Sequence, residues 1–211
     1  MGLRETKKLA MRQEIADRAM QLFATRGFDH VTVAEVAAAA GVSEKTVFNY
    51  FPTKEDLFFD EVPEREAALV EAVRGRRPGE SVLGAVRALQ AAECPRLCSP
   101  GFAVFARIIE SSEALQAREL EVMAHFAQVL ATEIERELGV DERDARIAAS
   151  LIIGVHRQLF RLARKRALEG RHGPAAVRRL RADLDRAFHL LEHGLGSLEQ
   201  PSDVSLAVHR S

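Results

Sequence analysis

Three helix-start signals and one tight-turn signal stand close together in the first third of the chain, and they constrain the fold more than any other feature. Thr32 is followed three positions later by Glu35, which is the pattern of a capping box. Gly41 can adopt the left-handed conformation that a tight turn needs. Ser43 and Thr53 are both good N-cap residues for further helices. The region therefore predicts short helices joined by tight turns.

The remainder of the chain continues the helical pattern. Apolar residues at helical spacing precede the short helices, namely Ile15, Ala19, Leu22 and Phe23. Later patterns predict helices at about 81–92, 101–111, 113–138, 142–169 and 174–194, with Cys94-Pro95 interpreted as a stop. No strand alternation and no internal repeat is found. We therefore expect an all-α fold.

Three parts are expected along the chain. Residues 1–53 are predicted to form an N-terminal helical domain, 54–196 a larger helical domain, and 197–211 a flexible tail without periodicity. The run RGRRPGE at 74–80 combines charge, glycine and proline, and it indicates a break between an N-terminal and a C-terminal part.

Composition excludes several classes of protein. No apolar run approaches the roughly 18 residues that span a bilayer, and the N-terminus lacks the apolar region of a secretory signal. Two cysteines do not make a disulfide framework, so a cytoplasmic location is expected. The net charge is −1, but residues 1–12 are basic, with Arg4, Lys7, Lys8 and Arg12 against Glu5 alone.

The short helices have the plan of a helix-turn-helix, whose second helix lies in the DNA major groove. One side of that helix must pack on the scaffold, and Val42, Val47 and Phe51 suit this role. Lys54, at the start of the next helix, suits a phosphate. The alternative is an amphipathic helix pair with merely solvated polar residues. The side predicted to face DNA carries Ser43, Lys45, Thr46, Asn49 and Tyr50.

Residues 10–58 resemble the N-terminal domain of tetracycline-repressor-type (TetR-family) regulators. The resemblance rests on the runs IADRAMQLFATRGF and VTVAEVAAAAGVSEKTVFNYFPTKEDL, which cover about a quarter of the chain. It implies a homodimer that binds a palindromic operator and is released by a small ligand in the C-terminal domain. It also implies phosphate contacts from Thr32, Thr46, Tyr50 and Lys54, and base contacts from Lys45 and Asn49.

The sequence departs from the family pattern at two positions of the second helix. Lys45 stands where the family often has glycine, and its long cation can reach guanine. Phe48 stands where tyrosine is common, so one phosphate hydrogen bond is expected to be absent.

The last two long helices carry wide apolar stripes. One stripe contains Ile147, Leu151, Val155, Leu159 and Leu162, and the other contains Val177, Leu180, Leu184, Phe188, Leu191 and Leu195. The resemblance implies that these helices form the four-helix bundle of a dimer. The alternative is that the stripes only fill the core of one protomer.

A ligand pocket is expected between the middle helices. The predicted lining is Phe102, Phe105, Ile109, Met123, Phe126 and Leu130, which suits an apolar or acyl-type ligand. The alternative is that these residues are core. The row Arg157, Arg161 and Lys165 either meets an anionic head group or forms a solvated face. Residues 102–170 loosely resemble the branch of the family with an acyl-CoA-like ligand-binding domain.

A single fourth helix is expected to connect the two sites. It would begin at Lys54 and pack on the ligand domain through Ala67, Leu69, Val70 and Val73, so that a ligand could move the DNA-binding end.

Other patterns carry less information. Cys94 and Cys98 are interpreted as structural rather than as a thiol switch or metal site, with Pro95 separating them. His189 and His193 have metal-compatible spacing but are interpreted as a surface or interface pair. No metal or other cofactor is expected. No nucleophile elbow, phosphate loop or dinucleotide fingerprint is present, so an enzyme is not expected, and the rival class is a helical lipid carrier.

Overall fold

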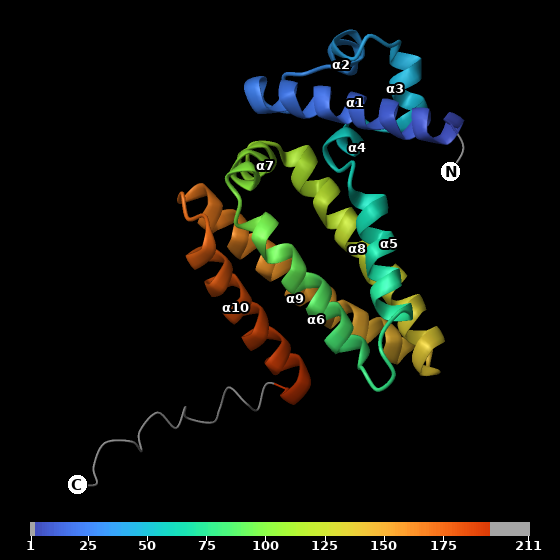
Figure 1. The fold of residues 1–211 in the computed structure, drawn as a ribbon, viewed down its shortest axis with the longest axis vertical. Helices are drawn as coiled ribbons and strands as arrows, with labels where there is room; N and C mark the ends of the chain where they lie inside the picture. The colour runs from blue at the N-terminus through green and yellow to red at the C-terminus, as the bar shows by residue number, and fades with distance from the viewer. Residues whose placement is uncertain (1–2, 195–211) are drawn as a thin grey trace, which may run out of the picture.

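The computed structural model describes residues 3–194, and within them every regular element is an α-helix, as the sequence predicts (Figure 1). The predicted tail at 197–211 and Leu195 of the apolar stripe lie outside the described residues. None of the described helices combines the length and apolar character that a membrane span requires. The helices are α1 (Leu3–Arg26), α2 (Val33–Ala39), α3 (Glu44–Tyr50), α4 (Lys54–Phe58), α5 (Val62–Arg74), α6 (Val82–Leu97), α7 (Pro100–Glu110), α8 (Glu113–Leu138), α9 (Glu142–Leu168) and α10 (Pro174–His193).

The short helices begin where the cap residues predict. Glu35 N donates to Thr32 Oγ1 at 3.3 Å, while Thr32 N donates to Glu35 Oε2 at 2.8 Å, so the capping box is complete. At the start of α3, the backbone N–H of Thr46 donates to Ser43 Oγ at 3.1 Å. Gly41 has a φ of +67°, a left-handed conformation that explains why glycine stands at this turn.

The capping box also makes stability depend on pH. Hydrogen bonds from the Thr32 backbone and from Arg26 lower the pKa of Glu35 from 4.5 to about 2. A carboxylate with a lowered pKa in the folded state stabilises the fold above its unfolded pKa, and this contribution disappears as pH falls through the folded value. We expect Glu35→Gln to be less stable than the wild type at neutral pH, and the difference to shrink between about pH 4.5 and about pH 2.

Urea unfolding at several pH values measures this effect, with Glu44→Gln on the exposed side of α3 as the matched charge control. A difference between wild type and Glu35→Gln that stays constant down to the acid end would contradict the role given to the capping carboxylate.

The predicted single fourth helix is wrong, because the structure divides it into α4 and α5. Pro63 occupies the second position of α5. A proline has no N–H to donate and its ring clashes with the carbonyl four residues earlier, so an unbroken helix cannot run through Phe59. The chain turns at residues 59–61 instead, and α4 is left as a short connector.

The predicted helix stop at Cys94-Pro95 is also wrong, since α6 continues through Pro95 to Leu97. Pro95 lies in the last turn of the helix, where the loss of one backbone hydrogen bond disturbs little. Cys94 and Cys98 are therefore not separated by a break, and the N–H of Cys98 donates to the Cys94 carbonyl at 3.1 Å. Both thiols are buried, and burial raises the pKa of each above its ordinary value. This favours the structural interpretation of the pair.

Residues 3–194 form two apolar cores. One belongs to α1–α4 and continues into α7 and α8 through Ile108, Ile109 and Leu115. The other fills the bundle of α5–α10. In Figure 1, α1, α2 and α3 group at one end, and α4 lies between them and the long helices. The N-terminal helices are thus packed onto the bundle rather than attached by a free linker.

The apolar stripes of the last two helices have different environments. In α10, Leu180, Leu184 and Phe188 are at most 1% exposed and pack inside the bundle, so these residues fill the core of one protomer. In α9, Ile147 and Leu151 are 54% and 56% exposed. The exposed part of the predicted stripe therefore lies on α9.

Candidate functional site

The helix α3 presents one apolar and one polar face, as the helix-turn-helix interpretation requires. Val47 is 1% exposed and anchors the helix, and Phe51, its C-cap residue, is equally buried. On the opposite side Lys45, Phe48 and Asn49 are exposed, with nearly half of the Phe48 ring open to solvent. The residues predicted to face bases thus project from the surface of a short, well-anchored helix.

The other predicted DNA contacts lie on α3 or at the starts of short helices. Thr32 and Ser43 are exposed N-caps, and Thr46 and Tyr50 are half-buried at the edges of α3. The hydroxyls of Ser43 and Thr46 are 2.9 Å apart. Thr46 and Tyr50 thus belong to α3 itself, whereas Thr32 and Lys54 lie at the starts of α2 and α4.

Lys54 is held by an aromatic ring. Its Nζ lies 4.0 Å from the centroid of the Phe28 ring, a cation–π distance. Burial lowers the pKa of Lys54, while Asp29 and Glu55 act in the opposite direction. The ring fixes the position of the charge, which would otherwise sample many rotamers on a flexible stem.

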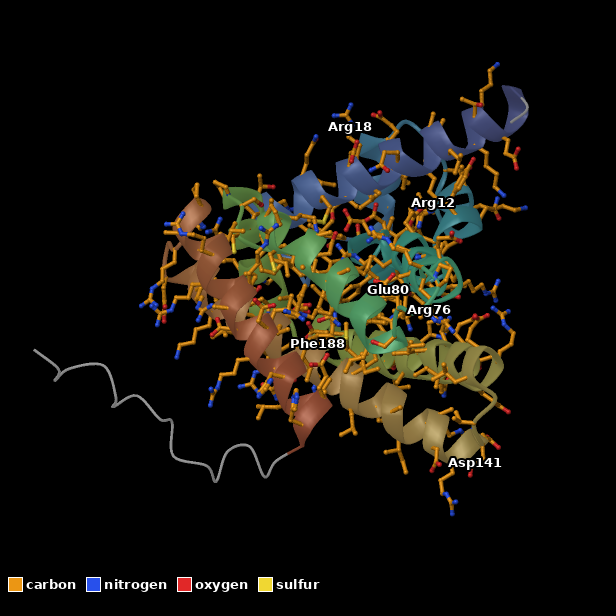
Figure 2. All side chains as sticks on the ribbon, turned by 60° about the horizontal axis from the view of Figure 1, so that its bottom comes forward. Arg12, Arg18, Arg76, Glu80, Asp141 and Phe188 are labelled. Carbon is orange, nitrogen blue, oxygen red and sulfur yellow. The ribbon has the colours of Figure 1, made fainter. Side chains whose placement is uncertain are left out.

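Arg12, one of the basic residues near the N-terminus, does not project freely from α1 (Figure 2). Its Nη2 donates to the backbone carbonyl of Asp60 at 2.6 Å, and its guanidinium lies 4.8 Å from the centroid of Phe51. Its Nη1 also lies 3.7 Å from Glu64. One side chain thus connects α1, the end of α3 and the turn between α4 and α5.

A cavity of about 320 Å³ lies where the N-terminal helices meet the bundle. Residues of α1, of the α4–α5 turn and of α5 to α9 line it. Much of the wall is aromatic, with the rings of Phe58, Phe59, Phe105, Phe126 and Phe160. The Phe58 and Phe105 rings stack with centroids 4.5 Å apart. A cavity of this kind suits a ligand with an apolar body.

The predicted ligand residues divide into two groups. Phe105, Met123 and Phe126 line the cavity. The other three side chains are buried elsewhere: Phe102 behind Phe105, Ile109 in the N-terminal core and Leu130 deep in the bundle core. Helical spacing placed all six on inward faces, but it could not show which inward residues face packed neighbours and which face empty space.

Sequence reasoning missed the wall that α1 contributes. Gln13, Ala16, Asp17 and Met20 line the cavity although they belong to the first helix of the chain. Their own spacing indicates only one face of an amphipathic helix. No signal in the sequence shows that this face borders a cavity and not a layer of packed side chains.

A polar cluster occupies one side of the cavity. Arg65 donates to Glu61 at 2.6 Å and to Glu93 at 3.2 Å, and Arg96 donates to Glu93 at 2.9 Å. His156 lies in the same wall, and burial lowers its pKa from 6.5 to about 4, with Arg65 acting in the same direction. Its imidazole is therefore neutral at pH 7.

Asp60 lies in the cavity wall at the α4–α5 turn. Burial, together with the neighbouring Glu61, raises the pKa of its carboxyl from 3.8 to about 6, while the charge of Arg12 acts in the opposite direction. Within the described residues no hydrogen bond or ion pair reaches this carboxylate, since Arg12 contacts only the backbone oxygen. In the same wall, Oε1 of the buried Gln90 accepts no hydrogen bond from the described residues. The wall thus contains acceptors without donors.

The basic row on α9 does not face the cavity. Arg157, Arg161 and Lys165 are exposed and are absent from its lining, which favours the alternative of a solvated face. Arg164 is buried instead, and its Nη1 donates to both oxygens of Glu119 at 2.8 and 2.9 Å.

His189 and His193 stack with ring centroids 4.1 Å apart, and no cluster of three or more metal-type side chains occurs among residues 3–194.

Comparison with known proteins identifies the N-terminal helices. The family described as "Bacterial regulatory proteins, tetR family" matches residues 15–60, which include α2, α3 and α4. The chain is 28% identical over 151 residues to the HTH-type transcriptional regulator TcmR of Streptomyces glaucescens, covering 68% of this chain and 67% of that protein. It is 48% identical over 54 residues to the HTH-type transcriptional regulator LuxR of Vibrio harveyi, covering 26% of each.

A solved structure extends the similarity over the whole fold. Thermus thermophilus FadR, described as a TetR family transcriptional repressor in complex with lauroyl-CoA, superposes with a TM-score of 0.50 at 28% identity. The match covers 95% of this chain and 99% of that one. The similarity to TcmR and FadR thus includes the bundle that holds the cavity as well as the N-terminal helices.

Proposed function

The chain belongs to the TetR family of bacterial regulatory proteins, and from that premise we propose that it is a ligand-responsive repressor that binds a palindromic operator as a homodimer. The observation that carries the proposal is the exposed polar face of α3 on a helix whose other face is buried. A small ligand with an apolar body, held in the cavity, releases the operator. The lauroyl-CoA complex of the similar FadR supports an apolar or acyl-type body for that ligand.

In this proposal the predicted DNA contacts form two groups, one that contacts bases and one that contacts phosphates. Lys45 and Asn49 contact base edges in the major groove, while Thr32, Ser43, Thr46, Tyr50 and Lys54 contact phosphates. Phe48 is exposed beside them and has no hydroxyl to offer a phosphate. Its ring suits contact with an apolar group of the DNA such as a thymine methyl.

Replacing Lys45 and Lys54 tests this division. We expect Lys45→Ala to relax sequence preference, at a cost of about 1–3 kcal/mol for a lost bidentate base contact. We expect Lys54→Met to weaken binding to all sequences alike and to lower the salt dependence by about one counterion. Methionine preserves contact with the Phe28 ring, so the second variant removes the charge with little change in packing.

Fluorescence anisotropy measures both effects, with the DNA upstream of the protein's own gene as operator candidate and a scrambled duplex as the non-specific reference. Arg18→Ala, on the exposed side of α1, serves as the charge control. If Lys45→Ala weakens binding to both duplexes equally, Lys45 does not read bases. If the wild type binds neither duplex above the non-specific level, a helical carrier without DNA binding becomes the better assignment.

The homodimer is proposed to form through α9 and α10. The support is the pair of exposed apolar side chains on α9, Ile147 and Leu151, which a monomer would leave in water. The buried residues of α10 hold that helix against the bundle and so fix its position beside α9. Two recognition helices held in this way must reach successive major grooves, about 34–36 Å apart.

Release is proposed to act through the turn between α4 and α5. This turn lines the cavity with Phe59 and Asp60, and it receives the hydrogen bond of Arg12, which also packs on Phe51 at the end of α3. A ligand that displaces the turn would move α4 and α3 together. Such a ligand releases DNA only if it binds the released arrangement more tightly, and a coupling of about 1–3 kcal/mol lowers operator affinity about 5–150-fold.

A further inference from the structure

The charges in the cavity wall leave only acidic groups without partners. The lining contains two arginines, Arg65 and Arg96, and both donate to carboxylates that lie in the same wall. Arg96 Nη1 also lies 3.9 Å from Glu61. The charges of both arginines are already balanced by these carboxylates, so an anionic head group would gain little attraction from them and would be repelled by Glu61 and Glu93.

No other group in the wall offers a positive charge. The remaining basic side chain is His156, which is neutral at pH 7 because burial lowers its pKa. Glu119 has its partner in Arg164, which does not itself line the cavity. The exposed basic row on α9 lies outside the lining, so the phosphates of an acyl-CoA would meet no free cation in the wall.

The orphan groups are acceptors. The Asp60 carboxylate lacks any hydrogen-bonded or ion-paired partner among the described residues, although the charge of Arg12 attracts it at longer range. Asp17, which lines the cavity from α1 and is exposed, has only the neutral amide of Gln13 at 3.0 Å. The buried Oε1 of Gln90 likewise lacks a donor. A partly buried carboxylate without a partner destabilises the folded protein, and a ligand that supplies N–H donors and a positive charge would offset that cost.

The aromatic wall favours the same kind of ligand. Phe58 and Phe59 directly precede Asp60, and their rings meet edge to face with centroids 5.1 Å apart. Phe105 stacks on Phe58 and packs against Phe160, which completes an aromatic surface beside the carboxylate. The faces of aromatic rings carry negative potential, so they attract a cation as well as an apolar chain.

We propose that the effector of this cavity is a lipophilic organic cation, an apolar or aromatic body that carries a protonated amine, and that the amine pairs with the carboxylate of Asp60. This inference rests on the proposed function in taking the cavity as the effector site, and it adds the charge of the ligand. Asp60 lies in the α4–α5 turn, and its backbone carbonyl accepts the hydrogen bond of Arg12, which also packs on Phe51 at the end of α3. A charge bound to Asp60 would therefore act next to the contact between this turn and α3.

A set of probes with one chain length and different head groups tests the charge preference. Isothermal titration calorimetry at about pH 8, below the micelle concentrations, compares dodecylamine, which is protonated there because amines titrate near 10.4, with neutral 1-dodecanol, laurate and lauroyl-CoA. We expect the wild type to bind dodecylammonium most tightly. Asp60→Asn should weaken dodecylammonium about 10- to 100-fold, as for a lost charge-assisted hydrogen bond, and leave 1-dodecanol unchanged.

Two features keep the test informative. Asp60→Asn should fold, because burial already opposes the charged form of this side chain. Glu71→Gln removes a negative charge from the exposed side of α5 that does not line the cavity, and it should change none of the affinities. The inference is overturned if the wild type binds laurate or lauroyl-CoA as tightly as dodecylammonium or more tightly, or if it does not bind dodecylammonium. It is also overturned if the ratio of dodecylammonium affinity to dodecanol affinity is the same in Asp60→Asn as in the wild type.

Operator binding by the same preparations separates this inference from the proposed function. If operator binds and laurate or lauroyl-CoA releases it, the repressor proposal holds and the cation inference fails. If dodecylammonium binds through Asp60 but no operator binds, the cation site stands and the repressor proposal fails.

Discussion

Leu184→Glu is expected to unfold the protein rather than to release folded monomers. Leu184 is 1% exposed and belongs to the core of the bundle, where α10 packs on α6 and α9. A glutamate at this position would bury a carboxylate without a partner and lose the leucine contacts, at a cost of about 4 kcal/mol or more. Because domains are stable by only about 5–15 kcal/mol, this change removes a large part of the total.

Circular dichroism during urea and thermal unfolding measures the loss. Leu184→Met is the matched control, because a volume-conserving apolar change costs less than about 1.5 kcal/mol. A Leu184→Glu protein that melts like the wild type but sediments as a monomer would show instead that Leu184 lies at the interface between protomers.

Leu151→Glu is expected to give folded monomers with greatly weakened operator binding. Leu151 is 56% exposed on α9, so a carboxylate there remains in water and leaves the fold of one protomer intact. In a dimer formed through this face of α9 the same carboxylate would be buried without a partner. Loss of the dimer removes the second half-site from each binding event, and we expect operator affinity to fall by about 10²–10⁴.

Analytical ultracentrifugation and operator binding measure the two parts of this prediction. Ser150→Glu places the same charge one residue away, on the exposed face that also carries Arg146 and Arg157, and it should leave both assembly and affinity unchanged. A Leu151→Glu protein that remains dimeric would exclude this part of α9 from the interface.

Local signals in the sequence were sufficient for the helices that carry the recognition face. The capping box of Thr32 and Glu35, the turn at Gly41 and the cap at Ser43 all act within four residues of chain. Hydrogen bonds of this range form in nearly the same way whatever the rest of the molecule does. The start of α2 and α3, and the division of α3 into an inward and an outward face, could therefore be predicted.

The two prolines show where local reasoning reaches its limit. Pro63 divides a predicted helix, whereas Pro95 sits inside one that was predicted to end before it. Both residues are proline, but they differ in their position in the helix and in what the adjacent helical turn packs against. The last turn of α6 is retained because Cys94, Leu97 and Cys98 are buried in the bundle core. Packing of this kind outweighs the lost backbone hydrogen bond.

By itself the sequence determined the all-α fold, the cap-defined helices of the N-terminal domain and the polar face of α3, because each depends on the order of neighbouring residues. Only the tertiary structure decided which apolar residues face a cavity, which fill a core and which remain exposed on α9. Asp17 of α1 and Asp60 of the α4–α5 turn line one cavity although more than forty positions separate them. Spacing along a helix identifies its inward face, but what lies opposite that face depends on how distant segments pack together.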